Sequence, residues 1–128
     1  MDENPLEGPV ELVLPADSRL VRLVRLMASG LASTVGFDVD DLDDLRIGVD
    51  EVLATLLEGG DGSPLLVRFR VQAAQVEVQG ETGTARDRLD PERLELSKQI
   101  LAAVVDEHEL GFEDERVLVR VCKRRTER

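Results

Sequence analysis

Hydrophobic residues recur along the chain with two different periods, which divide it into strands and helices. Alternation of apolar and polar residues is typical of a strand with one buried face. This alternation occurs at 10–14, 65–71, 76–78, 107–111 and 116–123. Because only a short stretch around Ala73 and Ala74 separates the second run from the third, residues 65–78 are predicted to form an antiparallel hairpin.

Apolar residues at steps of three and four predict three helices. The first follows an N-cap at Asp17 or Ser18, and the second, over 41–58, follows an N-cap at Asp38 or Asp40. The third starts near Pro91 and runs to about residue 105. The predicted buried stripes are Leu20, Val24, Met27, Leu31 and Val35 in the first helix, and Leu42, Leu45, Val49, Val52, Leu53 and Leu56 in the second.

The resulting order is strand, helix, helix, hairpin, loop, helix, strand, strand. We therefore predict an α/β two-layer sandwich in which three helices pack on one face of a mixed, mainly antiparallel five-stranded sheet. The domain spans 10–123, with a flexible lead-in over 1–9 and a basic tail over 124–128. The polar segment 80–92 is predicted to be a long loop, and such loops in compact domains are usually functional or mobile.

The charge balance argues against nucleic acid as a partner. The 128 residues include 27 acidic and 16 basic side chains, a formal charge of −11. Such a surface repels phosphate backbones. Two small basic groups exist, Arg19 with Arg22 and Arg25, and the tail Lys123, Arg124, Arg125 and Arg128. A solvated surface explains both groups better than direct nucleic-acid binding does.

The remaining chemistry-bearing residues are few. Cys122 is the only cysteine, lies in a predicted strand and is expected to be structural. His108 is the only histidine and has no second metal-binding residue at useful spacing, so no metal site is predicted. No apolar stretch is long enough to span a bilayer, and the acidic start lacks the basic region of a signal peptide. We expect a cytoplasmic protein with no membrane contact.

Residues 47–60, IGVDEVLATLLEGG, resemble the N box of the histidine-kinase-like (GHKL, Bergerat-type) ATPases, particularly the small bacterial anti-sigma serine kinases. The phrases LPADSRLVRLVRLMASGLASTVGF, DLDDLRIGVDEV and ILAAVVDEHEL are similar to the same subfamily. The similarity is one of order and pattern from about Val10 to Cys122. It implies that 10–123 is a histidine-kinase-like ATPase domain.

The resemblance assigns roles to individual residues. In the family's E-x-x-x-N motif, the Glu is the general base and the Asn holds Mg²⁺, and residues four apart share one helix face. Glu51 matches the catalytic Glu, whereas Thr55 stands at the Asn position. A Thr hydroxyl is a poorer ligand for Mg²⁺, which demands near-ideal octahedral oxygen placement.

Two further family motifs contact the nucleotide. The D-x-G-x-G motif, which holds adenine, is matched by ETGTA, with Glu81 for the Asp and Gly83 for the first Gly; an ordinary turn is the alternative interpretation. At the Gly-rich phosphate turn the chain has Glu95 and Ser97, whose side chains block the close approach that glycine permits. The candidate nucleotide-binding residues are therefore Thr55, Glu81 and Gly83, and neither ATP nor Mg²⁺ is expected as a firmly bound cofactor.

We predict an anti-sigma-factor-like regulator of transcription and stress response that acts by protein binding, with ATP binding and kinase activity weakened or lost. In the family the first helices hold a sigma factor, which points to Arg19, Arg22, Arg25, Asp41 and Asp44 as partner-binding residues. An anti-anti-sigma protein of the STAS type is the second implied partner. The alternatives are an active serine/threonine kinase acting on that protein, with Glu51 as base, and a homodimerisation module of the same fold.

Overall fold

The computed structural model describes residues 7–127, so most of the predicted lead-in, residues 1–6, and Arg128 of the predicted tail lie outside the described residues. In chain order the elements are β1 (Val10–Leu14), the 3-10 turn η1 (Ser18–Leu20), α1 (Val21–Ser33), α2 (Val39–Gly59), β2 (Leu65–Gln72), β3 (Gln75–Gly83), the 3-10 turn η2 (Arg86–Arg88), α3 (Pro91–Val104), β4 (Glu107–Glu113) and β5 (Arg116–Arg124). The predicted order of strands and helices is confirmed.

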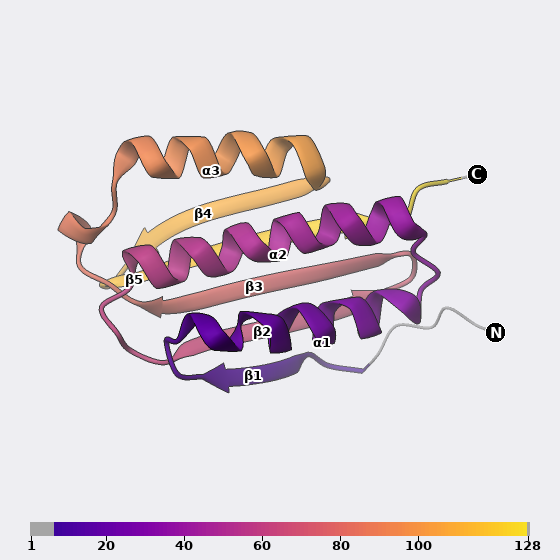
Figure 1. Cartoon of the computed structure of the whole chain (residues 1–128), viewed down its shortest axis with the longest axis horizontal. Helices are drawn as coiled ribbons and strands as arrows, with labels where there is room; N and C mark the ends of the chain where they lie inside the picture. The colour runs from indigo at the N-terminus through magenta and orange to yellow at the C-terminus, as the bar shows by residue number, and fades with distance from the viewer. Residues whose placement is uncertain (1–6, 128) are drawn as a thin grey trace.

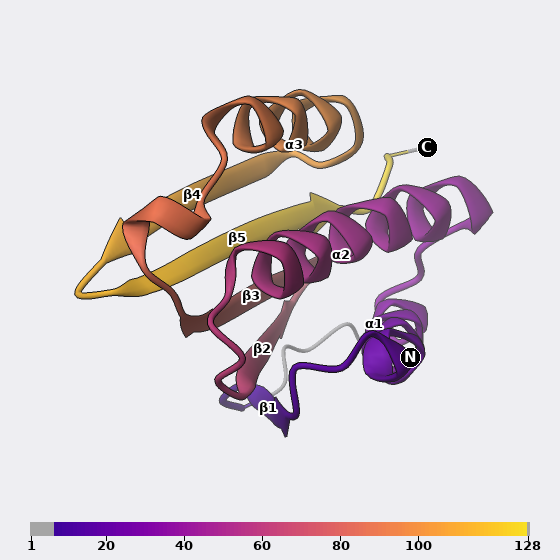
Figure 2. The same cartoon turned by 60° about the vertical axis from the view of Figure 1, so that its left-hand side comes forward.

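The five strands form one sheet in the order β1-β2-β3-β5-β4. All four pairings in the described chain are antiparallel, so the sheet is not mixed as predicted. Hairpins join β2 to β3 and β4 to β5. Helices α1 and α2 connect β1 to β2, and α3 connects β3 to β4, with β5 between these two strands in the sheet. Figure 2 shows α1, α2 and α3 on the same side of the sheet, which confirms the predicted two-layer architecture and leaves the other face bare.

The core lies between the helices and alternate residues of the strands. Val67 and Phe69 of β2, Val78 of β3, and Val119 and Val121 of β5 are fully buried against the helices. In α1 the buried residues are Val24, Ala28 and Ala32, while Met27 and Leu31 of the predicted stripe are only half-buried. The face of α1 that packs against the core is therefore the one that carries Ala28 and Ala32.

Helix α2 is the central helix, with α1 on one flank and α3 on the other (Figure 1). Asp38, one of the two N-caps predicted for this helix, is its N-cap and forms a capping box with Asp41. Gly48 and Thr55, which lie beside the main apolar stripe of α2, are buried as well. A Cβ atom on Gly48 would lie 2.9 Å from the Val105 side chain, which follows α3. The outward face of α2 stays exposed at Asp43, Arg46 and Ile47.

The predicted loop over 80–92 is wrong in its first part. β3 continues through Gly83, and residues 81–83 pair with 116–118 of β5. The hydroxyl of Thr82 donates to the carbonyls of Ser63 and Pro64, at 3.1 Å each, and fixes the strand end against the 61–64 loop. Composition suggested a turn, but pairing with β5 through Gly83, and with β2 as far as Glu81, outweighs this local preference. The true connection is residues 84–90.

Candidate functional site

A cavity of about 270 Å³ lies between the end of α2 and the start of α3. Its lining residues are Thr55, Glu58, Gly59, Arg88, Leu89, Asp90, Arg93 and Leu94. Thr55 therefore lines this cavity, and its role in nucleotide binding stays a prediction. Ligand sites in proteins usually measure roughly 300–1,000 Å³, so the space is smaller than a typical small-molecule site.

Arg93 of α3 closes one side of this cavity by binding two carboxylates of α2. Its Nη1 lies 3.2 Å from Oε1 of Glu51, and its Nε lies 3.1 Å from Oε1 of Glu58. The same Nη1 donates to the hydroxyl of Ser97 at 3.0 Å. The hydrogen bond that Arg93 donates to Glu58 is the main cause that raises the pKa of Arg93. The Glu51 side chain, 13% exposed, therefore has a fixed cation as its partner.

The structure separates Glu81 from Glu51. Gly80 and Thr82 face the helices, whereas Glu81 points to the bare face of the sheet, where its Oε2 lies 3.5 Å from Nε of Arg116. Because side chains alternate along a strand, a shift of one residue places a side chain on the opposite face. Glu81, predicted to bind nucleotide, therefore lies on the other face of the sheet from Glu51 and Thr55.

The strand position that does face α2 is tightly covered. A Cβ atom placed on Gly80 would lie 2.7 Å from Cδ1 of Leu56 and 2.8 Å from Cγ1 of Val52. Helix and strand are therefore in direct contact at this point, with no room for a planar ligand between them. Gly83 is covered as well, because a Cβ there would lie 2.9 Å from the Asp61 carboxylate. Gly83 does not line the cavity, contrary to its predicted role.

The connection over 84–90 packs down onto the end of α2. The Thr84 hydroxyl donates to the carbonyl of Gly59, and Nη1 of Arg88 donates to the carbonyl of Gly60 at 3.1 Å. The Leu89 side chain lies so close to Gly59 that a Cβ there would be 2.7 Å from it. These contacts hold the connection against the C-terminal end of α2.

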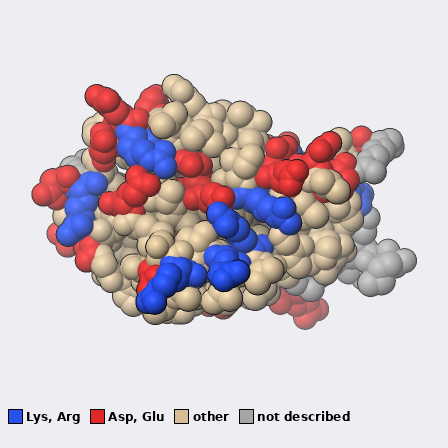
Figure 3. All heavy atoms as spheres, in the orientation of Figure 1, with Lys and Arg blue, Asp and Glu red and all other residues tan. Residues whose placement is uncertain are grey.

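A second candidate site is an open groove of about 420 Å³ between α1 and α2. It is lined by Arg22, Arg25, Leu26, Arg46 and Asp50. Arg25 forms a two-point ion pair with Asp50, at 2.6 and 3.0 Å, and Leu26 is 67% exposed. Figure 3 shows basic side chains gathered over these two helices. Three arginines against one aspartate make the groove locally positive on an acidic protein.

Only two of the five predicted partner-binding residues, Arg22 and Arg25, line this groove. Arg19 instead binds Asp17, and its hydrogen bonds lower the pKa of that carboxyl to about 2. Asp44 binds Lys123 at 3.2 Å. Arg46, which the sequence did not single out, completes the groove from α2 because it lies beside α1 only in the folded chain.

Asp41 is 1% exposed and so is not available at the surface, contrary to its predicted role. It accepts hydrogen bonds from the Asp38 amide and from the amide and hydroxyl of Thr126, the last at 2.6 Å. Burial opposes the charged carboxylate, but these hydrogen bonds outweigh it and lower the pKa of Asp41. Nη1 of Arg125 also donates to the Val35 carbonyl at 3.1 Å, so the predicted tail is packed onto the domain at both residues.

No helix within residues 7–127 is both long and apolar enough to cross a membrane. That part of the chain also brings no three His, Cys, Asp or Glu side chains together in a way that could hold a metal ion. Cys122 is buried in β5, and burial is the main cause that raises the pKa of its thiol.

Comparison with curated proteins relates the chain to one kind of protein. It is 30% identical over 71 residues to the serine-protein kinase RsbW of Halalkalibacterium halodurans, covering 54% of this chain and 44% of that protein. It is 34% identical over 73 residues to RsbW of Bacillus velezensis, with 54% and 46% covered. For RsbW of Listeria monocytogenes the values are 31% over 87 residues, with 64% and 55% covered. The chain thus spans about half the length of the curated relatives it matches.

Comparison with solved structures gives the fold. A crystal structure of the RsbU and RsbW domains of a Mycobacterium tuberculosis protein matches with a TM-score of 0.71 and 16% identity, covering 92% of this chain and 32% of the other. No profile of a known protein family matches the chain. In sequence the chain is therefore similar to serine-protein kinases named RsbW, and in fold it is similar to the RsbU and RsbW domain structure.

Proposed function

We propose that the protein is an anti-sigma-factor-like regulator that acts through protein–protein binding and has weak or no kinase activity. The observation that carries the proposal is the contact of Arg93 with Glu51. Under the family resemblance Glu51 is the general base, and a base must accept a proton from the attacking hydroxyl. In the folded chain the Glu51 carboxylate instead accepts a hydrogen bond from the Arg93 guanidinium at 3.2 Å and is only 13% exposed, so it is not free to face an attacking hydroxyl.

The packing around Gly80 supports the same proposal. Phosphoryl transfer depends on positioning the nucleotide and neutralising its charge. The side chains of Val52 and Leu56 occupy the space over Gly80 of β3. The cavity of about 270 Å³ between α2 and α3 is lined by Glu58 and Asp90 as well as by Arg88 and Arg93. Neither the space nor the charge favours a triphosphate.

Titration calorimetry with ATP and magnesium tests this part of the proposal. We expect no saturable heat for the wild-type protein and none for Arg93→Ala, because removing the guanidinium leaves Gly80 covered. Saturable binding by the wild type would favour the alternative, an active kinase with Glu51 as base. In that case phosphate transfer to a STAS-type protein should disappear in Glu51→Gln.

The partner surface that we propose is the groove between α1 and α2. Its positive charge fits an acidic segment of a sigma factor, and exposed Leu26 offers an apolar contact within the same surface. Complementary charge sets partner choice and encounter rate more than affinity, whereas a buried apolar anchor supplies affinity. An anti-anti-sigma protein would release the sigma factor if it competed for this groove.

Binding to purified candidate sigma factors, measured by surface plasmon resonance, tests the surface. Arg22→Glu and Arg46→Glu should each slow association by about tenfold at low salt, and Leu26→Ser should mainly speed dissociation. Arg70→Glu, an exposed change on the bare sheet face, is the matched control and should bind like the wild type. A complex that tolerates all three groove changes would refute this surface, and the absence of any complex would refute the function.

A further inference from the structure

The sheet ends at β4, whose outer edge pairs with no strand within residues 7–127. Such an edge presents unpaired backbone amide and carbonyl groups, which can bind an added strand. Glu107, Glu109, Gly111 and Glu113 alternate toward the bare face of the sheet, while His108, Leu110 and Phe112 alternate toward α3. In a strand added at this edge, every second side chain would lie beside Glu107, Glu109, Gly111 and Glu113 on the bare face of the sheet.

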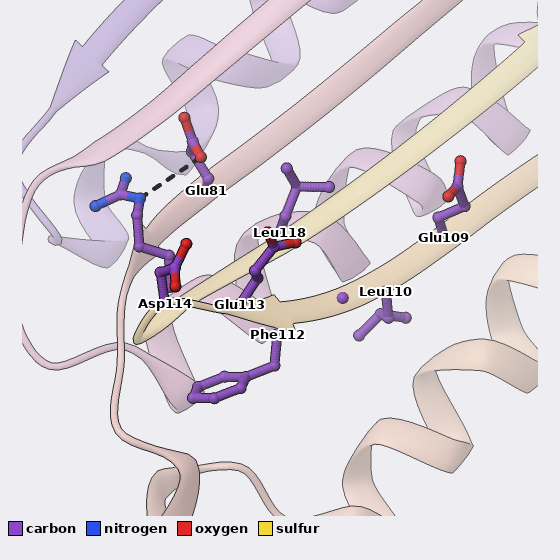
Figure 4. A pocket seen from close by; sticks show the side chains of 9 residues that line it. Glu81, Glu109, Leu110, Phe112, Glu113, Asp114 and Leu118 are labelled. Carbon is purple, nitrogen blue, oxygen red and sulfur yellow. Dashed lines mark ion pairs between the residues drawn. The ribbon is translucent and has the colours of Figure 1, made fainter.

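A groove of about 420 Å³ lies beside the β4–β5 turn and extends from β4 across β5 to Glu81 of β3. Its lining residues are Glu81, Glu109, Leu110, Gly111, Phe112, Glu113, Asp114, Arg116 and Leu118. In Figure 4 the Phe112 ring points away from Glu113 and Leu118, which lie on the other side of the strand.

Gly111 makes a notch in the middle of the groove. A Cβ atom on this residue would meet no atom within 4 Å, so the space beside it is open. Leu118, its partner in β5, is half-buried and forms the apolar floor of the notch. The notch fits an apolar side chain from an added strand.

The rim of the notch is acidic. Glu109 and Glu113 lie two residues to either side of Gly111, and Asp114 follows at the turn. Glu109 accepts a hydrogen bond from Nη1 of Arg120 at 3.1 Å and remains 71% exposed, whereas Glu113 and Asp114 have no salt-bridge partner among the described residues. The basic residue that lines the groove, Arg116, is paired with Glu81. The backbone of Asp114 and Glu115 has positive φ, of 51° and 58°, typical of a tight two-residue turn that holds the rim in place.

We propose that β4 binds an extended basic segment of a partner protein by strand addition. In the bound segment an apolar residue covers the notch at Gly111, and Lys or Arg residues two positions before and after it face Glu109 and Glu113. The two-residue period of a strand requires this spacing. The site lies at the opposite edge of the sheet from β1 and does not depend on the groove between α1 and α2 or on the proposed function.

The probe is a fluorescently labelled synthetic peptide with the core lysine-threonine-leucine-threonine-lysine, and its binding is measured by fluorescence anisotropy. A label is needed because the protein has no Trp or Tyr whose fluorescence could report binding. Its isomer threonine-lysine-leucine-lysine-threonine has the same composition but places the lysines on the face opposite the leucine. We expect saturable binding of the first peptide, at least about fivefold weaker binding of the isomer, and weakening by added salt. Equal binding of the two peptides, or no saturation up to about 1 mM, would overturn the proposal.

Variants of the protein locate the site. Glu113→Lys should weaken binding roughly tenfold, and Gly111→Val, which fills the notch with a residue that strands tolerate well, should abolish it. Glu95→Lys makes the same charge change on the exposed surface of α3 and should leave binding unchanged. Circular dichroism checks that each variant is folded.

Amide hydrogen exchange identifies the mode of binding. Bound peptide should slow exchange in β4 and leave α1 unchanged. Protection confined to α1 and α2 would overturn the proposal in favour of a charge contact with the other groove. Sedimentation showing that the free protein already dimerises, and that Gly111→Val makes it monomeric, would assign the edge to a second copy of this chain instead.

Discussion

Arg93 of α3 and Glu51 of α2 are 42 positions apart in the sequence and form a hydrogen-bonded ion pair of 3.2 Å at the wall of the cavity. The pair joins the two helices and neutralises the carboxylate that the family resemblance makes catalytic. It is sheltered, with 29% of the arginine and 13% of the glutamate side chain exposed. Its loss would therefore affect both stability and the chemistry that Glu51 can perform.

Arg93→Ala should lower the free energy of unfolding by about 1–2 kcal/mol, between the small effect of surface ion pairs and the larger effect of buried ones. Urea unfolding followed by far-UV circular dichroism measures this change. Arg70→Ala is the control, because Arg70 is an exposed arginine of β2 and its loss should change stability by less than about 0.5 kcal/mol. Equal effects of the two substitutions would show that the bridge contributes nothing.

Gly80→Ala should destabilise the protein by about 1–3 kcal/mol, because the added methyl group must displace Val52 or Leu56 in a packed core. Gly30→Ala tests the same change where a Cβ meets nothing within 4 Å, inside α1. There it should stabilise by about 0.5–1 kcal/mol, since alanine favours helix more than glycine does. Thermal unfolding of the two variants should shift in opposite directions, and a neutral Gly80→Ala would show that α2 can move away from β3.

Thr126→Val should cost about 1 kcal/mol of stability, because it removes the hydroxyl that binds the buried carboxylate of Asp41 and keeps the side-chain shape. The same variant should increase amide exchange at the start of α2, which the C-terminal segment covers. Thr34→Val is a useful comparison, since the Thr34 hydroxyl only binds a carbonyl within its own exposed helix end. Similar losses in both variants would contradict the special role of the Asp41 contact.

The stability of the protein should fall in acid partly through Asp41, whose pKa is lowered from its ordinary 3.8. A carboxyl with a lowered folded-state pKa contributes stability above its ordinary pKa, and this contribution is lost as the pH falls through the folded-state value. Asp41→Asn should therefore be less stable than the wild type above about pH 4, with a difference that shrinks below that pH. Asp40→Asn, at an exposed neighbouring position, should follow the wild-type curve within a few tenths of a kcal/mol. Parallel curves for Asp41→Asn and wild type across this range would contradict the assignment.

Several features followed from sequence alone because they depend on short-range periodicity. The alternating runs located the strands, the stripe from Leu42 to Leu56 located α2, and Asp38 was one of two predicted caps. In each case the local pattern and the burial in the fold agree, as is usual for strongly periodic segments. Glu51 and Thr55 could be placed together for the same reason, since four residues make about one helical turn.

Tertiary structure alone decided which side chains from different elements meet. The end of β3 became a strand because it pairs with β5, and this set Glu81 on the bare face and Gly80 under α2. Arg93 reaches Glu51, and Thr126 reaches Asp41, only because helix packing and the path of the last strand bring them together. Local composition holds no signal for contacts between such distant residues, since their energy is gained only when the core forms.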